Sequence, residues 1–314
     1  MNNQKIQWFP GHMHKARKQI EEIIPKTDII VEILDARIPF SSKNPLIRHL
    51  RKDKSVIKVL NKRDLADPAM TALWLKHLEK EQGTKTMAIT TTQITEVNKI
   101  IDLCHSIFPN RRKIGKHIHA LIVGIPNVGK STIINMLARR VVAKTGNEPA
   151  ITRQQQRVKL ESGIVLSDTP GILWPKLENP NTGYRLAATG AVKDTVVEYD
   201  EVAFYIVEYL ANTYPDLLRK RYHIERLPDN AIELMGTIGQ KRGCLRSGGR
   251  IDLSKASRIL INELRNGVLG LITLEYPDII NKELLKVEET MAVEADKQIR
   301  RKKERRQRYL KNKR

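Results

Sequence analysis

Residues 124–131 (GIPNVGKS) match the pattern G-x-x-x-x-G-K-[ST], in which a glycine-rich loop wraps around a phosphate group. The loop follows the apolar run HALIVG and precedes the helical pattern STIINMLARR, which is the strand–loop–helix setting that this chemistry requires. In that setting backbone N–H groups and the helix dipole bind the anion. Lys130 then meets the β- and γ-phosphates, and Ser131 can ligate Mg²⁺. The spacing therefore predicts a site for a nucleoside triphosphate.

A second short motif, DTPG at residues 168–171, ends the apolar run GIVLS. An aspartate there, Asp168, can hold the water shell of Mg²⁺, and Gly171 can offer its N–H to a γ-phosphate. DTPG on its own is a common turn. Its place after a predicted strand, 44 residues beyond Gly124, favours the phosphate role.

The motif NKRD at residues 61–64 follows the predicted strand SVIKVL. The carboxylate of Asp64 can accept two hydrogen bonds from the N1–H and N2–H₂ edge of guanine, and adenine lacks that pair of donors. Asn61 can serve the other side of the base, while the stem of Lys62 can lie along its face. NKRD alone can be a surface turn, but together with a phosphate loop it indicates guanine.

The first 175 residues alternate apolar runs with helical patterns, which predicts a mostly parallel α/β sheet whose loops carry ligands at the carboxyl ends of the strands. The expected strands are residues 28–34, 55–60, 86–90, 118–125 and 163–167. After Pro175 the patterns become helical, without alternating strands. The expected helices there are residues 182–191, 201–213, 229–239 and 254–267, with Ser254 as N-cap and Gly267 as the stop.

Three segments are expected from these patterns. They are an α/β domain with the guanine-nucleotide motifs at residues 1–178, a helical domain at residues 179–282 and a basic extension at residues 283–314. Because neither Gly nor Pro occurs after Pro277, the last segment can form one long helix.

The order of the motifs is unusual, because NKRD precedes the phosphate loop, Thr152 and DTPG. This rotated order resembles the circularly permuted, translation-factor-related GTPases. With WFPGHMHKA at residues 8–16, LDARIP at 34–39 and LRNGVLG at 264–270, the chain resembles the ribosome biogenesis GTPase A family. The resemblance implies that residues 1–178 are a circularly permuted P-loop GTPase domain of α/β class and that the helical domain at residues 179–282 binds RNA or the ribosome. It also implies a factor for late assembly of the large ribosomal subunit. Such a factor binds rRNA in its GTP state and leaves after hydrolysis.

The resemblance also implies site residues. Thr152 matches a switch threonine that meets Mg²⁺ when GTP is bound, although it can also be an ordinary loop threonine. Thr90 and Thr91 fall where a Ser-Ala pair usually contacts guanine, and Asn127 matches an asparagine that holds K⁺. The nucleotide-binding set is then Asn61, Lys62, Asp64, Thr90, Thr91, Asn127, Val128, Gly129, Lys130, Ser131, Thr132 and Gly171, with Ser131, Thr152 and Asp168 for Mg²⁺.

The residue that orients the attacking water is not evident from the motifs. After DTPG stands Ile172, where a Ras-like enzyme carries glutamine, and Ile172 cannot align water by hydrogen bonding. The resemblance assigns this role to the histidine of FPGHM, His12, since an imidazole can polarise or orient water. The alternatives are that His12 caps the following helix or contacts rRNA.

The net charge of the chain indicates which kind of molecule it binds. The chain carries 56 Lys and Arg against 35 Asp and Glu, a net charge of +21, and residues 297–314 alone hold +10. This block favours nucleic acid, while a solvated tail or an anionic membrane surface remain alternatives. We therefore weigh an rRNA-binding GTPase against a nucleic-acid-binding module that uses GTP only as a ligand and against a membrane-associated GTPase. With two distant cysteines and no signal peptide or membrane span, the sequence predicts a cytoplasmic protein without disulfides.

Overall fold

The computed structural model describes residues 11–113, 115–143, 156–174 and 179–312 of the chain. The chain divides into a compact unit that ends at Glu275 and a second unit that begins at Tyr276. The second unit consists mainly of α12 (Pro277–Asn312), the single long helix that the lack of Gly and Pro predicts. The expected domain boundaries at residues 178 and 282 stay predictions.

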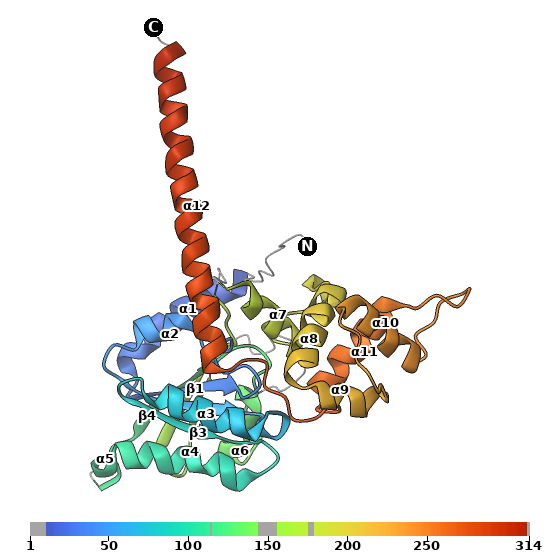
Figure 1. Ribbon diagram of the computed structural model, residues 1–314. Helices are drawn as coiled ribbons and strands as arrows, with labels where there is room; N and C mark the ends of the chain where they lie inside the picture. Colours follow the sequence, from blue (N-terminus) through green and yellow to red (C-terminus); the bar gives the residue numbers. More distant parts are fainter. Residues whose placement is uncertain (1–10, 114, 144–155, 175–178, 313–314) are drawn as a thin grey trace. The chain divides into compact units, whose positions relative to one another are not determined.

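Six strands form one sheet in the order β3-β2-β1-β4-β6-β5 (Figure 1). All neighbouring strands run parallel except β5, which is antiparallel to β6. Every residue of β1, IIVEILD, is buried, as expected for a central parallel strand that is covered on both faces. The mostly parallel α/β sheet is thus confirmed. Its strands are β1 (Ile29–Asp35), β2 (Ser55–Asn61), β3 (Thr84–Ala88), β4 (Ile118–Gly124), β5 (Gln156–Lys159) and β6 (Ile164–Asp168).

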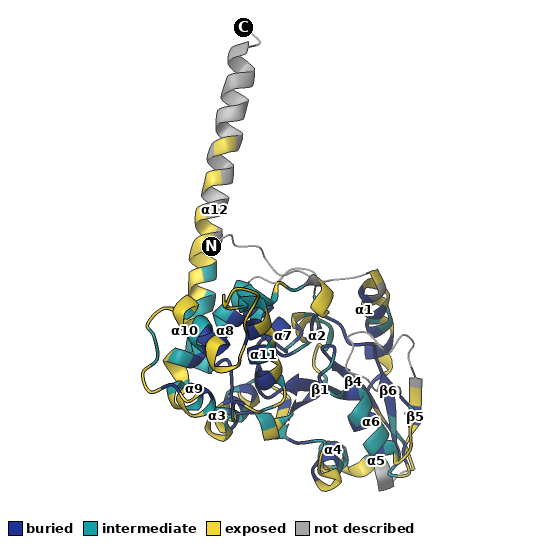
Figure 2. Cartoon of the chain, turned by 90° about the vertical axis from the view of Figure 1, so that its right-hand side faces the viewer, coloured by how far each residue is buried: buried dark blue, intermediate teal, exposed yellow. Residues whose placement is uncertain are grey.

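Helices cover both faces of the sheet. Residues of α1 and α2, such as Ile20 and Ile47, form one buried cluster with Ile30 of β1, while Ile29 and Val31 belong to a second cluster with α4 and α6 (Figure 2). This alternation follows from the two-residue period of a strand. The helical elements of this half are α1 (Gly11–Ile23), η1 (Ile24–Lys26), α2 (Pro45–Leu50), η2 (Arg63–Leu65), α3 (Pro68–Glu79), α4 (Ile94–Ile107), α5 (Pro109–Lys113) and α6 (Lys130–Ala138).

The central strands lie within one residue of their expected bounds, and the two edge strands differ most from the sequence prediction. β3 begins and ends two residues before the expected range, since Thr84 pairs with Val56. β5 was not expected, because QRVK offers one buried apolar residue, Val158. An edge strand tolerates charged side chains, so its pattern in the sequence is weak.

The second half of the first unit is helical, as predicted, and its described part contains no strand, only an isolated bridge between Leu245 and Ile251. Asp252 rather than Ser254 caps α11, since its side chain accepts from the Lys255 N–H, whereas the Ser254 hydroxyl donates to Asp200. These elements are α7 (Pro180–Ala188), η3 (Asp194–Val196), α8 (Tyr199–Thr213), α9 (Pro215–Tyr222), α10 (Ala231–Lys241) and α11 (Leu253–Arg265). α11 ends at Arg265, and Gly267 follows with a positive φ of 72°, so the predicted glycine stop is confirmed.

The segment after α11 returns to the sheet half and joins the two halves. Ile272 donates its N–H to the Leu65 carbonyl, and Leu274 donates to the Arg37 carbonyl. The buried carboxylate of Glu275 accepts bonds from the backbone and hydroxyl of Ser41. The segment between α11 and α12 therefore contacts the loops that leave β1 and β2.

The described helices include none that is long and apolar enough to cross a membrane. Both cysteines of the sequence, Cys104 and Cys244, are buried and not joined in a disulfide.

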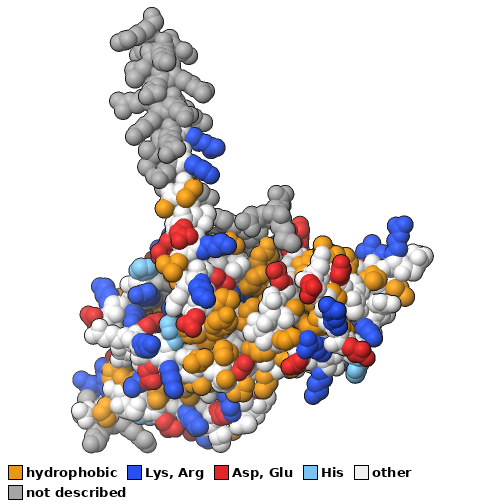
Figure 3. Space-filling view, viewed as in Figure 1, with side chains coloured by type: hydrophobic (Ala, Val, Ile, Leu, Met, Phe, Trp, Pro, Cys, Tyr) orange, Lys and Arg blue, Asp and Glu red, His pale blue; other side chains and the backbone are white. Residues whose placement is uncertain are grey.

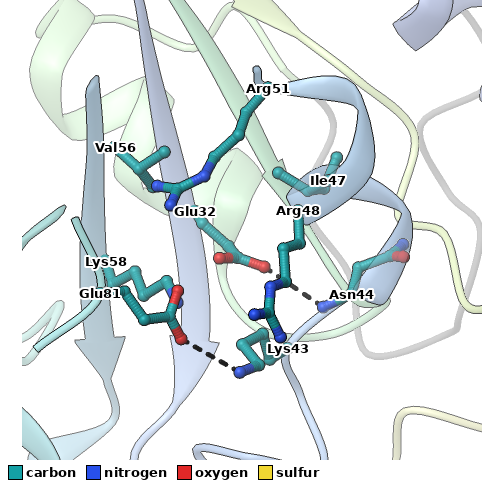
Figure 4. A pocket seen from close by; sticks show the side chains of 9 residues that line it. All are labelled: Glu32, Lys43, Asn44, Ile47, Arg48, Arg51, Val56, Lys58 and Glu81. Carbon is teal, nitrogen blue, oxygen red and sulfur yellow. Dashed lines mark hydrogen bonds and ion pairs between the residues drawn. The ribbon is translucent and has the colours of Figure 1, made fainter. Parts of the chain in front are cut away.

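Charged side chains of β1, β2 and the residues around α2 line a small pocket, among them Glu32, Lys43, Lys58 and Glu81 (Figure 4). Glu32 and Lys58 stand opposite each other in the parallel register. Lys58 also donates to Glu81 over 2.6 Å, and Lys43 reaches the same carboxylate over 3.1 Å. Burial on its own raises the pKa of Glu81, but the two lysines outweigh burial and lower it to about 2.

Replacing Glu81 with Gln should therefore destabilise the protein in a pH-dependent way. Because the folded pKa lies below the ordinary value of 4.5, the ionised group stabilises the fold above that pH, and the stabilisation disappears as the pH falls toward about 2. Denaturant unfolding should show wild type more stable than Glu81→Gln at pH 7, with a difference that shrinks below pH about 5. The control is Glu79→Gln, which removes an exposed ion pair to Lys85 and should change stability little. A difference that does not vary with pH would contradict this role of Glu81.

Candidate nucleotide-binding site

The parallel register brings the three predicted motifs to one edge of the sheet. Asn61 at the end of β2 pairs with Asp35 at the end of β1. On the other side of β1, Gly124 at the end of β4 pairs with Ile33. Asp168 at the end of β6 pairs with Ile122 of β4. NKRD, the phosphate loop and DTPG therefore leave the sheet at the same carboxyl edge, although they are distant in sequence.

The phosphate loop is held by the guanine motif. Asn61 is buried, and its Nδ2 donates to the Val128 carbonyl over 2.8 Å. Gly129 has a φ of 101°, which a residue with a side chain rarely adopts, and a Cβ there would collide with the Asn61 amide. Asn61 thus contacts the loop backbone. Ser131 and Thr132 lie in the first turn of α6, directly after the loop.

Lys130 and Asp168 face each other beneath the loop. The ammonium of Lys130 donates to the carbonyls of Gly124 and Ile125 over 3.0 and 2.7 Å. Burial lowers the pKa of Lys130 to about 8, against the charge of Asp168. Burial raises the pKa of Asp168 to about 6, against the charge of Lys130. The ammonium of Lys130 and the carboxyl group of Asp168 are thus both held in a site from which most water is excluded.

The DTPG turn closes against the loop. A Cβ at Gly171 would lie 2.8 Å from the Pro126 backbone and 3.0 Å from the Lys130 ammonium. Only glycine allows that approach without a shift. The next residue, Ile172, is buried in a cluster with Ala16 and Ile20 of α1, and its N–H donates to the Gly124 carbonyl. Its side chain is therefore part of the core.

The predicted fifth motif lies beside NKRD. Arg63 donates its backbone N–H to the Ile89 carbonyl over 3.1 Å, and its side chain pairs with Glu96. The Glu96 carboxylate also accepts the N–H of Thr90 over 2.9 Å. These contacts hold Ile89 and Thr90, the residues before Thr91, against Arg63, and the exposed Asp64 follows Arg63 in the chain.

Lys62 adopts a left-handed conformation and turns toward the phosphate loop. Its ammonium donates to the Asn127 carbonyl over 2.8 Å and pairs with Asp35 over 3.2 Å. Asp35 also forms a two-point pair with Arg37, at 2.9 and 2.8 Å. Burial on its own raises the pKa of Asp35, but Arg37 and Lys62 outweigh burial and hold it well below its usual range.

Asn127 links the loop to the helical half. Its Nδ2 donates to the Gly190 carbonyl over 2.8 Å, immediately beyond α7. Sequence reasoning did not identify Asp35, Arg37 or Gly190 as neighbours of the phosphate loop. The motif LDARIP was a signal for the first two, but a sequence gives no indication of what their side chains contact.

Two predicted residues lie wholly or partly outside the described structure. Thr152 lies outside the described residues. His12 is the second residue of α1, and its side chain lies outside the described part. However, α1 packs on the same buried cluster as Ile172, through Ala16 and Ile20.

The carboxylate of Asp168 fits a magnesium site. Both of its oxygens are buried and have no hydrogen-bond partner in the described part of the chain. An unpartnered buried carboxylate is costly, and a divalent cation or its water shell would satisfy it. Ser131, at the start of α6, carries a hydroxyl, a ligand type that suits Mg²⁺.

Comparisons with known proteins agree with this geometry. Residues 119–234 match the family described as 50S ribosome-binding GTPase. The chain is 46% identical over 280 residues to the ribosome biogenesis GTPase A of Bacillus pumilus, with 87% of this chain and 99% of that protein covered. It is 34% identical over 298 residues to the mitochondrial ribosome-associated GTPase 1 of Ictalurus punctatus, with 87% and 93% covered.

Two solved structures of YlqF are also similar. The GDP-bound structure has a TM-score of 0.58 and 26% identity, and it covers 83% of this chain and 99% of the YlqF chain. The GNP-bound structure of the Thermotoga maritima protein has a TM-score of 0.57 and 26% identity, with 84% and 98% covered. The fold is that of a circularly permuted P-loop GTPase.

Replacing Asp64 with Asn should change the base that the site accepts. The amide presents an N–H₂ group where the carboxylate would accept from the N2 amino group of guanine, so GTP affinity should fall by about a hundredfold or more. Xanthine carries an oxygen at that position, so the variant should gain affinity for xanthosine triphosphate. Fluorescence titration with both nucleotides measures the change. An equal loss for both nucleotides, or unchanged GTP binding, would mean that Asp64 does not read the base.

Proposed function

Because the chain belongs to the ribosome biogenesis GTPase A family, we propose that it binds and hydrolyses GTP to assist late assembly of the large ribosomal subunit. In this proposal it binds rRNA in the GTP state and is released on hydrolysis. The observation that carries the nucleotide part is the meeting of NKRD, the phosphate loop and DTPG at one edge of the sheet. A role on the ribosome places the protein in the cytoplasm.

The proposed nucleotide contacts are made by the loops at that edge of the sheet. Asp64 reads the guanine, and Thr90 and Thr91 lie beside the base. The backbone from Asn127 to Thr132 binds the phosphates, with Val128 and Gly129 at the turn and Lys130 as the cation. A phosphate would take over the hydrogen bonds that Lys130 now donates to the loop carbonyls. Gly171 offers its N–H to the γ-phosphate.

Ser131, Thr152 and Asp168 are the proposed ligands of Mg²⁺ or its water shell. When bound there, Mg²⁺ neutralises charge on the β- and γ-phosphates. The unpartnered oxygens of Asp168 support its part in this set. Asn127 is the proposed K⁺ ligand by family resemblance, and its side-chain amide is oriented by Gly190.

Hydrolysis should be slow in the isolated protein. Ile172 is buried with α1 and cannot orient a water molecule. We propose His12, at the start of the same helix, for that role. The large subunit would then stimulate hydrolysis by placing the His12 imidazole beside the attacking water.

Two basic segments are the proposed rRNA contacts. The last residue of α10, Lys241, and the loop that follows it expose basic side chains, and Lys and Arg side chains gather over the end of this loop (Figure 3). In the loop they are Arg242, Arg246 and Arg250. The helix α12 ends in the block of residues 297–314, which holds +10. Phosphate groups of RNA suit both segments.

GTP hydrolysis should be measured in K⁺ buffer, with and without purified large ribosomal subunits, for the wild type and His12→Ala. We expect subunits to stimulate the wild type strongly, and the variant to lose about a hundredfold of that stimulation or more. A co-sedimentation assay must show that the variant still binds the particle.

Other results would change the proposal. Equal stimulation of wild type and variant would remove His12 from the mechanism but keep the GTPase. GTP binding without any stimulation by the particle would favour a nucleic-acid-binding module that uses GTP only as a ligand.

A further inference from the structure

Two motifs have no direct part in the proposed nucleotide contacts. They are DARIP at residues 35–39 and LRNGVLG at residues 264–270, which are more than 200 positions apart. The structure brings them together, since an Arg37 guanidinium nitrogen lies 3.4 Å from the Arg265 carbonyl oxygen. Arg37 is fully buried at this contact. Their meeting point lies between the sheet edge and the helical half.

The guanidinium of Arg265 holds the carboxyl end of α7. It donates to the carbonyls of Ala187 and Ala188 over 2.8 and 3.0 Å. It also pairs with Asp194 over 3.0 Å and lies over the ring of Tyr199. The last carbonyls of a helix have no partner within the helix. A cationic side chain that donates to them therefore fixes the path of the backbone directly after the helix.

The next part of the chain is Gly190, which has a φ of 82°. A Cβ built on it would lie 3.5 Å from Arg265, so the two residues are in contact range. The Gly190 carbonyl is the acceptor for the side-chain amide of Asn127. Arg265 therefore sets the position of the group that orients the phosphate-loop amide.

A second route reaches Asn127 from the other side. Arg37 contacts the Arg265 carbonyl and forms its two-point pair with Asp35. Asp35 pairs with Lys62, and Lys62 donates to the backbone carbonyl of Asn127. The side-chain amide of Asn127 is thus linked to the guanidinium of Arg265, and the backbone carbonyl of Asn127 is linked to the backbone carbonyl of Arg265. Together the two series of contacts form a closed ring.

We propose that Arg265 is a positioning residue for the phosphate loop, which it controls through the Gly190–Asn127 hydrogen bond and the Arg37–Asp35–Lys62 chain of ion pairs. This inference rests on the proposed nucleotide site. It adds Arg265 to that site, although Arg265 lies 75 positions beyond Gly190 in the chain. Through this ring, the helical half and the bound nucleotide influence each other's position.

The test is a double-mutant cycle on the full-length chain, with fluorescent mant-GDP and a non-hydrolysable mant-GTP analogue as probes. Arg265→Lys keeps the charge, but one ammonium cannot replace the planar fork that serves two carbonyls and a carboxylate. Asn127→Gly removes the amide while glycine tolerates the left-handed conformation. We expect Arg265→Lys to weaken nucleotide binding about tenfold in the wild-type background and less than about twofold in the Asn127→Gly background.

The matched control is Arg258→Lys. Arg258 also lies on α11 over the ring of Tyr199, but it is exposed, and none of its described contacts reaches the α7 carbonyls. It should change affinity less than about twofold in either background. Arg37→Lys is measured in the same cycle, so that the result does not depend on the folding of one variant. It acts through the Lys62 bond to the backbone carbonyl of residue 127, which Asn127→Gly keeps, so it should weaken binding by a similar factor in both backgrounds.

Equal fold-changes for Arg265→Lys in both backgrounds, or no loss of affinity in Arg265→Lys or in Arg37→Lys, would overturn the positioning role. Failure of the wild type itself to bind either guanine nucleotide would instead contradict the proposed function.

Discussion

Strands β2, β1, β4 and β6 run parallel, so their carboxyl ends meet at one edge of the sheet, and most features of the site depend on that register. Asn61, Gly124 and Asp168 are brought together by strand pairing, whatever the order of their strands in the chain. This is why a rotated order of motifs still produces a complete nucleotide site. The central strand β1 ends between the guanine motif and the phosphate loop, so its terminal residue, Asp35, contacts Lys62 of the guanine motif.

The rotated order has a structural consequence. DTPG is followed by the helical half, and the end of that half returns to the loops after β1 and β2 through Ile272 and Leu274. The buried core is continuous between the two halves. Because Asn127 donates to Gly190, a movement of the phosphate loop around a phosphate would reach the end of α7 directly. Coupling between nucleotide state and the helical surface needs no further element.

The motifs and the central strands could be predicted because each is a local pattern: an apolar run followed by Gly, Asp or Lys at fixed spacing. The edge strands were predicted poorly, since β5 has a single buried apolar side chain. The cap of α11 was assigned to Ser254, because serine and aspartate are both good N-caps and only the backbone geometry selects Asp252. Arg265 could not be assigned a contact, since its partners Ala187 and Arg37 are fixed only by the tertiary fold.

The central claim is that nucleotide state at the sheet edge changes the helical half. Hydrogen exchange of residues 180–275, compared between the GDP complex and the complex with a non-hydrolysable GTP analogue, tests it most directly. The account predicts different exchange at the end of α7, where the N–H groups of Gly190 and Ala191 are bonded to Ala187 and Leu186. Identical exchange throughout residues 180–275 in the two saturated complexes would contradict it.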